Sequence, residues 1–299
     1  MQGLMDSVRC LVNPSAGRGA GAKSLDRLRR WAERTGGEVE ISTGPEDLES
    51  QARRAAEDGV ERLVVVGGDG TQHFAVQGLV GTSCALAVVP LGSGNDLAMS
   101  LGIPKDLEDA LEHAVEGEIR SIDVGRVDAP EGPVYFAMYC GVGFDSEVTR
   151  VANEEVRFVR GSLIYPWAVV KTLVGFSPPR LRVTHDEGTW HRRAMFATAA
   201  NGPSFGGGMK IAPNAEMDDG LFDLVLVDAV PKLRLLRIFP QVYRGRHLSR
   251  PEVTVVRTRS LHLSVDRPMV LYGDGEALVP IPEEGLRVTI DPGALRVVG

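Results

Sequence analysis

Residues 63–74 read LVVVGGDGTQHF, an apolar run that passes directly into a loop with almost no side chains. A short run that is apolar on both faces is typical of a strand buried in a parallel sheet. Ligands of such sheets bind beyond the carboxyl ends of the strands, where GGDGT lies. Glycines let a ligand approach the backbone closely, and bare N–H groups before a helix favour phosphate. The stretch therefore indicates a phosphate-binding loop, with a tight turn capped by Asp69 and Thr71 as the plainer alternative.

The same strand-then-helix pattern continues on both sides of this loop. Apolar runs predict four strands, at residues 8–12, 38–43, 62–66 and 85–89. Apolar residues at three- and four-residue spacing predict helices between them. We expect an α/β domain with a parallel sheet over residues 1–122.

Beyond residue 122 the pattern changes to runs separated by turn residues, which predicts a mainly antiparallel β-sandwich-like domain over residues 123–299. The predicted strands are residues 121–127, 133–144, 180–186, 192–202, 221–228, 261–265, 269–276 and 286–290. Helices are expected only near residues 145–175 and 231–244. Whether the last segment returns to the first domain is left open.

Composition limits the class of protein. The chain has 299 residues, enough for two domains, and a net charge of −7 predicts no general attraction to nucleic acid or to anionic membranes. The three cysteines lie far apart and indicate reduced thiols in a cytoplasmic protein. There is no signal-peptide pattern, and the apolar stretch 162–176 is too short and too broken by Pro166 and Lys171 to span a bilayer.

A second loop repeats the chemistry of the first. VVPLGSGNDLA, residues 88–98, ends a predicted strand with two glycines around Ser93, followed by Asn95 and Asp96. Helix N-capping explains an Asn or Asp at that place. It does not explain why two successive strand ends both carry glycines, a hydroxyl and an acid.

A third loop, VNPSAGRGAGAKS at residues 12–24, follows the first predicted strand. Its glycine spacing does not fit a dinucleotide fingerprint, and Ala22 stands where a Walker A motif needs glycine. We interpret it as a lid near the phosphates, with Asn13 as a polar contact.

Taken together, these motifs resemble the diacylglycerol kinase catalytic-domain family, which includes bacterial diacylglycerol kinases, YegS-like lipid kinases and the related sphingosine kinases. The segments that carry the resemblance follow family order: NPSAGRG, GGDGTQH, PLGSGNDLA, GVGFDSEV, NGPSFGGGMKIAPNAEMDDGLFD and YGDGE. The resemblance implies a nucleotide-binding α/β domain and a β-sandwich-like domain with the active site between them. GGDGT alone is also found in NAD kinases and phosphofructokinases.

The resemblance implies that the first domain binds ATP. The residues it assigns to this role are Asn13, Thr43, Gly67, Gly68, Asp69, Gly70, Thr71, Gln72, His73, Ser93 and Asp96. Ser93 replaces the usual threonine and keeps the hydroxyl. Gln72 and His73 replace an apolar residue and an asparagine, which puts the role of His73 in doubt.

The acidic loop NAEMDDGLFDL, residues 214–224, is by composition a turn with solvated acids. In similar kinases this loop holds a structural Mg²⁺. The resemblance implies the carboxylate of Asp219 and the main-chain carbonyls of Glu216 and Leu221 as its ligands, which suits the oxygen preference of this ion. A second Mg²⁺ is expected to accompany ATP.

The segment YGDGE, residues 272–276, could be a simple β-turn. In the family it is the catalytic segment. The resemblance favours Glu276 as the acceptor of the lipid hydroxyl proton and implies that Asp274 works with Asp69 and Asp96 in a network of magnesium and water. The reverse assignment is left open.

The function expected from the resemblance is transfer of the γ-phosphate of ATP to a hydroxyl of a lipid in phospholipid metabolism. The acceptor is a diacylglycerol, another glycerolipid, a sphingoid base or a prenyl-like alcohol, met at the inner membrane surface. A homodimer is left open. Residues 163–176 and the stretch LRLLRIFPQVYRGR at 233–246 are candidates for lipid entry or surface contact, with core packing as the alternative. The alternative functions are an NAD kinase-like enzyme and a nucleotide-binding regulator without catalysis.

Overall fold

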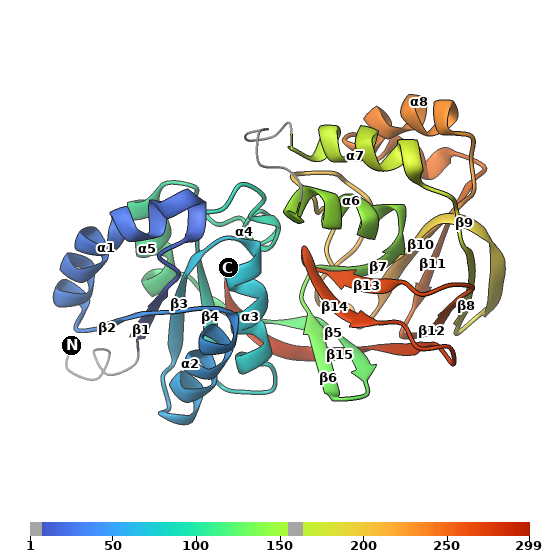
Figure 1. Ribbon diagram of the computed structural model, residues 1–299. Helices are drawn as coiled ribbons and strands as arrows, with labels where there is room; N and C mark the ends of the chain where they lie inside the picture. The colour runs from blue at the N-terminus through green and yellow to red at the C-terminus, as the bar shows by residue number, and fades with distance from the viewer. Residues whose placement is uncertain (1–7, 155–163) are drawn as a thin grey trace. The chain divides into compact units, whose positions relative to one another are not determined.

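The computed structural model describes residues 8–154 and 164–299. The chain forms two compact units, Met1–Val124 with Pro292–Gly299, and Gly125–Asp291 (Figure 1). The predicted fold class is confirmed, because the first unit holds parallel strands and the second is antiparallel and sandwich-like. Residues 163–176 are one of the candidate stretches for lipid entry, and their first residue, Leu163, lies outside the described residues.

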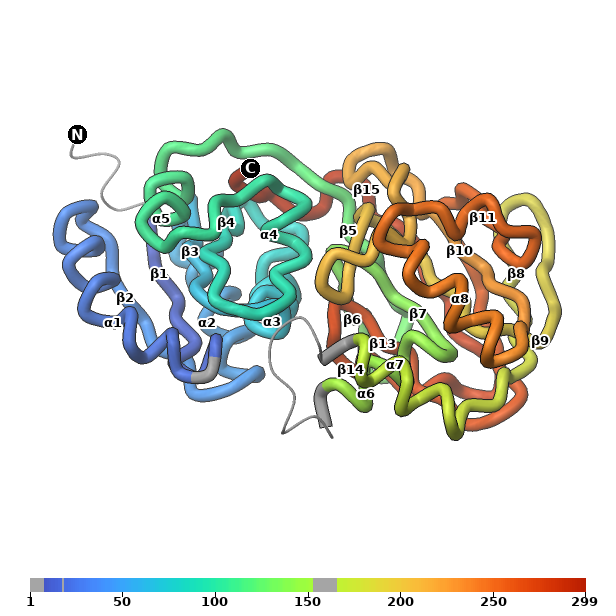
Figure 2. Tube along the Cα trace, turned by 90° about the horizontal axis from the view of Figure 1, so that it is seen from above, coloured from blue at the N-terminus to red at the C-terminus, as the bar shows by residue number. Residues whose placement is uncertain are grey.

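The first unit is built on a parallel sheet whose strand order is β2-β1-β3-β4-β15. The strands are β1 (Val8–Val12), β2 (Glu38–Ile41), β3 (Arg62–Gly67), β4 (Ala85–Pro90) and the end of β15 (Leu286–Val298). Val297 of β15 pairs with Leu86 of β4, which ties the C-terminal segment into this unit (Figure 2). The central residues of β3 are almost fully buried, so both faces of the sheet are covered as the sequence predicted.

Five helices follow the strands of this unit in chain order. They are α1 (Ala16–Thr35), α2 (Pro45–Glu57), α3 (Asp69–Leu79), α4 (Asp96–Leu101) and α5 (Leu107–Glu116). The prediction of a loop up to residue 24 is wrong, because α1 already begins at Ala16. A Cβ on Gly21 would lie 2.1 Å from the carbonyl oxygen of Asn13. The glycine therefore lets the helix start directly against the end of β1.

The second unit is a sandwich of antiparallel strands. They are β5 (Ile119–Ala129), β6 (Gly132–Phe136), β7 (Tyr139–Gly143), β8 (Arg180–His185), β9 (Gly188–Ala200), β10 (Phe222–Asp228), β11 (Val253–Thr258), β12 (Ser260–Val265), β13 (Val270–Gly273) and β14 (Glu276–Pro280), with the start of β15. The long strand β9 pairs with β8 along its first half and with β7 and β10 along its second. The core between the layers is closed by side chains such as Phe136 and Phe222, which stack on each other.

In the described part of the second unit, the sandwich is accompanied by the helices α6 (Phe144–Glu154), α7 (Ile164–Gly175) and α8 (Lys232–Val242) and by the short 3₁₀ turn η3 (Arg246–Ser249). The single strand expected over residues 133–144 is wrong, because the structure has two strands that break at Ala137 and Met138. Strand β11 was not predicted. None of the helices in the described part of the chain is long and apolar enough to cross a membrane.

Candidate active site

The two glycine loops of the first unit lie against each other. They follow neighbouring parallel strands, in which Gly67 pairs with Pro90. A Cβ added to Gly68 would lie 3.0 Å from the Cα of Gly92, and one added to Gly92 would lie 2.7 Å from the Cα of Gly68. Side chains at either position would force the loops apart, so the structure explains why both strand ends carry glycine.

Asp69 joins these loops through its carboxylate. Its Oδ2 accepts a hydrogen bond from the main-chain N–H of Asn95 at 2.8 Å, and its Oδ1 accepts one from Asp96 at 2.7 Å. These N–H groups open α4 and have no partner within that helix. Asp69 therefore caps α4 from another loop, whereas Asn95 uses its own side chain to bond both main-chain groups of Gly92. The part of Asp69 and Asp96 in a magnesium–water network stays a prediction.

The first loop of the chain meets the GGDGT loop at one hydrogen bond. The Nδ2 of Asn13 donates to the Oγ1 of Thr71 at 2.9 Å, and the main-chain N–H of Asn13 donates to the carbonyl of Val66. The structure thus brings together three of the predicted nucleotide loops, which follow β1, β3 and β4.

The other predicted nucleotide contacts lie in different environments. Gly70 is in the first turn of α3, and Ser93 has an exposed side chain. Thr43 donates to the carboxylate of Asp47 through its N–H and its hydroxyl, which lowers the pKa of that carboxyl. Gln72 and His73 are buried on α3. For these two residues, direct contact with a nucleotide stays a prediction.

In the second unit, the YGDGE segment is a two-residue β-hairpin between β13 and β14. Asp274 and Gly275 have φ values of 51° and 88°, and Gly273 pairs with Glu276 across the turn. Positive φ at both central residues defines a type I′ turn, for which Asp-Gly is a preferred sequence. The β-turn interpretation is therefore correct, and it fixes the position of Glu276 as the first residue of β14.

The carboxylate of Asp274 holds the junction between β6 and β7. It accepts hydrogen bonds from the main-chain N–H groups of Ala137 at 2.7 Å, Met138 at 2.9 Å and Tyr139 at 3.1 Å. The N–H of Asp274 in turn donates to the carbonyl of Tyr139. Three of the roughly four lone-pair positions of the carboxylate are thus occupied by main chain. This geometry points to Asp274 as a structural anchor for its hairpin.

In the acidic loop, Asp219 lies next to a positively charged side chain, Arg257. Its Oδ1 accepts from the main-chain N–H of Leu221 at 2.9 Å, and its Oδ2 pairs with the guanidinium of Arg257 on β11. Burial raises the pKa of Asp223, the positive charge of Arg257 partly opposes this, and the charges of Asp219 and Glu216 raise the pKa further. Negative charge therefore gathers here, but the Asp219 carboxylate does not fit a metal ion unless Arg257 moves away. Within residues 8–154 and 164–299, no group of three or more His, Cys, Asp or Glu is arranged to hold a metal.

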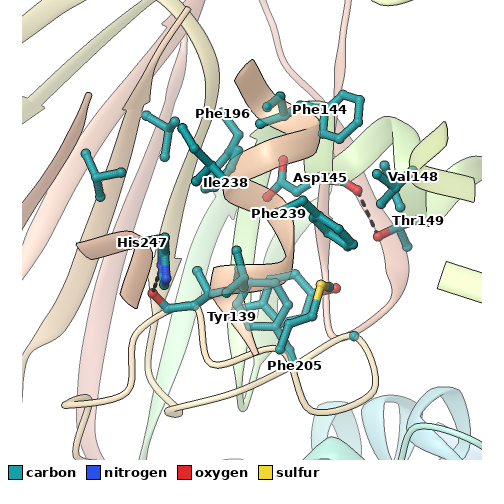
Figure 3. Close-up of a pocket in the computed structure, with 18 residues that line it drawn as sticks. Tyr139, Phe144, Asp145, Val148, Thr149, Phe196, Phe205, Ile238, Phe239 and His247 are labelled. Atoms are coloured by element: carbon teal, nitrogen blue, oxygen red, sulfur yellow. Dashed lines mark hydrogen bonds between the residues drawn. The ribbon is translucent and has the colours of Figure 1, made fainter. Parts of the chain in front are cut away.

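An apolar pocket lies inside the second unit, and part of its lining comes from residues 163–176 and 233–246, the two stretches that the sequence marked as candidates for lipid entry or surface contact (Figure 3). Its walls come from β7, α6, α7, β9, the loop around Phe205, β10, α8, η3 and β11. Tyr139 stacks on Phe205 with ring centroids 3.6 Å apart. The walls come from residues 139 to 253, too far apart in the chain for a motif.

Asp145 is the acid that lines this pocket (Figure 3). Its Oδ2 accepts from the hydroxyl of Thr198 at 2.7 Å, and its Oδ1 accepts from the N–H of Ser146. Burial raises the pKa of Asp145 to about 6 in spite of these hydrogen bonds. A Cβ on Gly141 would lie 2.4 Å from Oδ2, so the neighbouring strand needs glycine to admit the carboxylate. The signal in the sequence was an acid placed directly after the apolar run YCGVGF, residues 139–144.

His247 lines the same pocket and is also buried. Its Nε2 lies 3.0 Å from the carbonyl oxygen of Ile211, a geometry in which Nε2–H donates. Burial lowers the pKa of His247. The ring is therefore neutral at physiological pH.

Comparison with known proteins agrees with the two-unit fold and the loops described above. Residues 7–127 match the family model described as the diacylglycerol kinase catalytic domain. Residues 138–299 match the model described as the YegS C-terminal NAD kinase beta sandwich-like domain. The chain belongs to the diacylglycerol kinase catalytic-domain family. Members of this lipid kinase family are enzymes, and the chain is a kinase of that family.

Relatives of the family cover almost the whole chain. A diacylglycerol kinase of Mycobacterium tuberculosis is 34% identical, with 97% of this chain and 94% of the relative covered. A diacylglycerol kinase of Bacillus subtilis is 28% identical, with 94% and 93% covered. A crystal structure of a diacylglycerol kinase from Bacillus anthracis str. Sterne covers 98% of this chain and 96% of its own, with a TM-score of 0.72 and 18% identity. This last likeness shows the fold alone.

Proposed function

We propose that the protein transfers the γ-phosphate of ATP to a hydroxyl group of a lipid, with a diacylglycerol or a related glycerolipid or sphingoid as the acceptor. Membership of the lipid kinase family supports the class of reaction. The observation that carries the proposal is a hydrogen bond that joins the DGE hairpin to the wall of the apolar pocket. Asp274 accepts the N–H of Tyr139, and the ring of Tyr139 is part of the pocket wall.

The acyl or alkyl part of the acceptor would occupy the apolar pocket. Burying apolar surface there is favourable by roughly 25 cal/mol per Å². Asp145 supplies a carboxylate inside the pocket that can accept a hydrogen bond from a polar group of the acceptor. A hydrocarbon chain next to a polar head matches this combination, whereas a nicotinamide dinucleotide, which is polar along its length, does not.

Glu276 would act as the general base. A lipid hydroxyl is a weak nucleophile until its proton has an acceptor, and a carboxylate within hydrogen-bond reach supplies one. Glu276 is half-buried at the start of β14, directly after the turn that Asp274 anchors. The main-chain bonds of Asp274 suit a positioning role, which leaves the base role to Glu276.

On the first unit, the glycine loops after β3 and β4 would bind the phosphates of ATP. At Gly68 and Gly92 the loops carry no side chains and pack closely against each other, and bare N–H groups at such strand ends, next to a helix N-terminus, favour phosphate. Mg²⁺ bound with ATP would neutralise the charge of the β- and γ-phosphates. We also propose the structural Mg²⁺ at Glu216, Asp219 and Leu221, on the condition that Arg257 releases Asp219. A cytoplasmic enzyme that acts at the inner membrane surface in phospholipid biosynthesis accords with this function, with a homodimer left open.

A panel of acceptors tests the proposal. The purified protein is incubated with labelled ATP and Mg²⁺ and, in separate reactions, with a diacylglycerol, a monoacylglycerol, a sphingoid base, a prenyl-like alcohol and NAD, and products are identified by mass. We expect a phosphorylated lipid. A phosphorylated NAD would favour the NAD kinase-like alternative. ATP binding without any product would favour the regulator.

A further inference from the structure

Helix α8 is apolar on two opposite faces. One face lines the apolar pocket and consists of residues at helical spacing, namely Leu235, Ile238, Phe239 and Val242 (Figure 3). On the outer side, Leu233 is 72% exposed and Leu236 is 39% exposed. A helix on the surface of a soluble protein normally presents polar side chains outward. The outer residues of α8 therefore need an explanation other than the core.

Helix α7 shows the same arrangement. Val169 lines the pocket, whereas Trp167, Val170 and Val174 on the other side are exposed, Val174 by 77%. The Nζ of Lys232 donates to the carbonyl oxygen of Val174 at 2.6 Å, which joins the end of α7 to the start of α8 (Figure 1). We call the exposed set of these two helices the α7/α8 outer face. It comprises Trp167, Val170, Val174, Leu233 and Leu236, together with Tyr243, the residue that caps the end of α8.

The charge around this face is opposite to that of the whole protein. The chain carries a net charge of −7, yet residues 231–251 contain six Lys and Arg and no Asp or Glu. All six are exposed. Arg237, Arg244 and Arg246 have no ion-pair partner within residues 8–154 and 164–299, while Arg234 pairs with Glu252. The Nζ of Lys171 adds a further positive charge 5.1 Å from the ring centroid of Trp167.

We propose that the α7/α8 outer face docks the protein on a lipid bilayer that carries anionic lipids. Exposed apolar side chains among Lys and Arg are the features of a helix that lies in a membrane interface. Basic residues close to an anionic leaflet contribute about 1 kcal/mol each, or about fivefold in binding. The inner faces of the same helices line the pocket, so docking would bring the pocket next to the bilayer. The inference rests on the proposed function only in taking the bilayer as the source of the acceptor.

Vesicle flotation without ATP tests the docking by itself. The wild-type protein is mixed with phosphatidylcholine vesicles that contain increasing fractions of phosphatidylglycerol. We expect binding that rises with the anionic fraction and falls with added salt. Arg237→Gln/Arg244→Gln should bind about 25-fold more weakly, from about fivefold per residue. The matched control Arg30→Gln/Arg34→Gln removes two exposed arginines of α1 and should bind like the wild type.

A second pair of variants tests the apolar part. Val174→Ser/Leu233→Ser replaces two exposed side chains, so folding should be kept, and should weaken binding at every salt concentration. Equal binding of all variants, or no binding of the wild-type protein to anionic vesicles, would overturn the proposal. The proposal would also be overturned if the wild-type protein sedimented as a dimer and Val174→Ser/Leu233→Ser as a monomer, because the face would then be a contact between two copies of the chain.

The same variants separate this inference from the proposed function. A short-chain diacylglycerol dissolved as monomers needs no docking, so the docking variants should phosphorylate it at the wild-type rate. Failure of the wild-type protein to phosphorylate it would contradict the proposed function and leave the vesicle result standing. Loss of activity on the dissolved acceptor in the docking variants would instead place these residues in the pocket and overturn the docking role.

Discussion

Replacement of Asp274 should destabilise the second unit much more than replacement of Glu276. In Asp274→Ala the N–H groups of Ala137, Met138 and Tyr139 lose their shared acceptor. These three residues are almost fully buried, so water does not replace the carboxylate. An unsatisfied buried donor costs about 1–3 kcal/mol, and a left-handed alanine at φ 51° adds about 1 kcal/mol. A loss of at least about 3 kcal/mol is expected.

The stability of Asp274→Asn should lie between that of Asp274→Ala and that of Glu276→Gln. One amide oxygen can still accept from Met138 and Tyr139, but the NH₂ group would face the N–H of Ala137, where two donors oppose each other. The expected loss is about 1–3 kcal/mol, and asparagine tolerates the left-handed conformation. Glu276→Gln should leave stability within about 0.5 kcal/mol of the wild type.

Thermal unfolding followed by calorimetry measures this series. For a domain of this size, 1 kcal/mol corresponds to roughly 2–4 °C in Tm, so Asp274→Ala should melt at least about 6 °C lower than the wild type. The anchoring role would be refuted if Asp274→Ala melted at the wild-type temperature. It would also be refuted if Glu276→Gln were destabilised to the same extent.

Three further perturbations address other parts of the protein. Burial raises the pKa of Asp145 to about 6, so the folded protein keeps a proton that the unfolded chain loses near pH 4. The free energy of unfolding should therefore fall as pH rises from about 4 to 6, by about 3 kcal/mol at about 1.4 kcal/mol per pH unit, and stay level above pH 6. Denaturant titrations of Asp145→Asn should not show this fall, and the same pH dependence in the variant and the wild type would contradict the raised pKa. Gly68→Val should abolish ATP binding in calorimetric titration because its side chain would push into Gly92, and unchanged affinity in a folded variant would count against the loop assignment. Asp219→Ala should lose any Mg²⁺-dependent rise in Tm, whereas Arg257→Gln should show the rise at lower Mg²⁺; no Mg²⁺ effect in the wild type or in Arg257→Gln would remove the structural metal from the account.

Local sequence patterns predicted the parallel sheet because its strands are buried on both faces. RLVVV and ALAVV contain only apolar residues after the first, and both form buried strands of the sheet. The break between β6 and β7 could not be predicted, because Ala137 and Met138 are as apolar as their neighbours. It depends on the carboxylate of Asp274, more than 130 residues away in the chain.

The candidate site was predictable only where a motif is continuous. The glycine loops stood out because close approach of two backbones requires glycine at both places. The cap that Asp69 provides for α4 and the pairing of Asp219 with Arg257 were not visible, since each joins groups that the sequence separates. The other walls of the apolar pocket were missed for the same reason. Strand β11 was missed because its residues alternate poorly and, among the described strands, it pairs with β10 alone.

The most direct test of lipid phosphorylation with Glu276 as the base is the turnover of Glu276→Gln with ATP and a diacylglycerol, measured beside its ATP affinity and that of the wild type. The wild-type protein should form a phosphorylated diacylglycerol. Glu276→Gln should form it about 10²–10⁴-fold more slowly, the usual effect of losing a positioned general base, with ATP affinity unchanged. Wild-type turnover in Glu276→Gln would contradict the assignment of the base, and no lipid product from the wild-type protein on any acceptor would contradict the function itself.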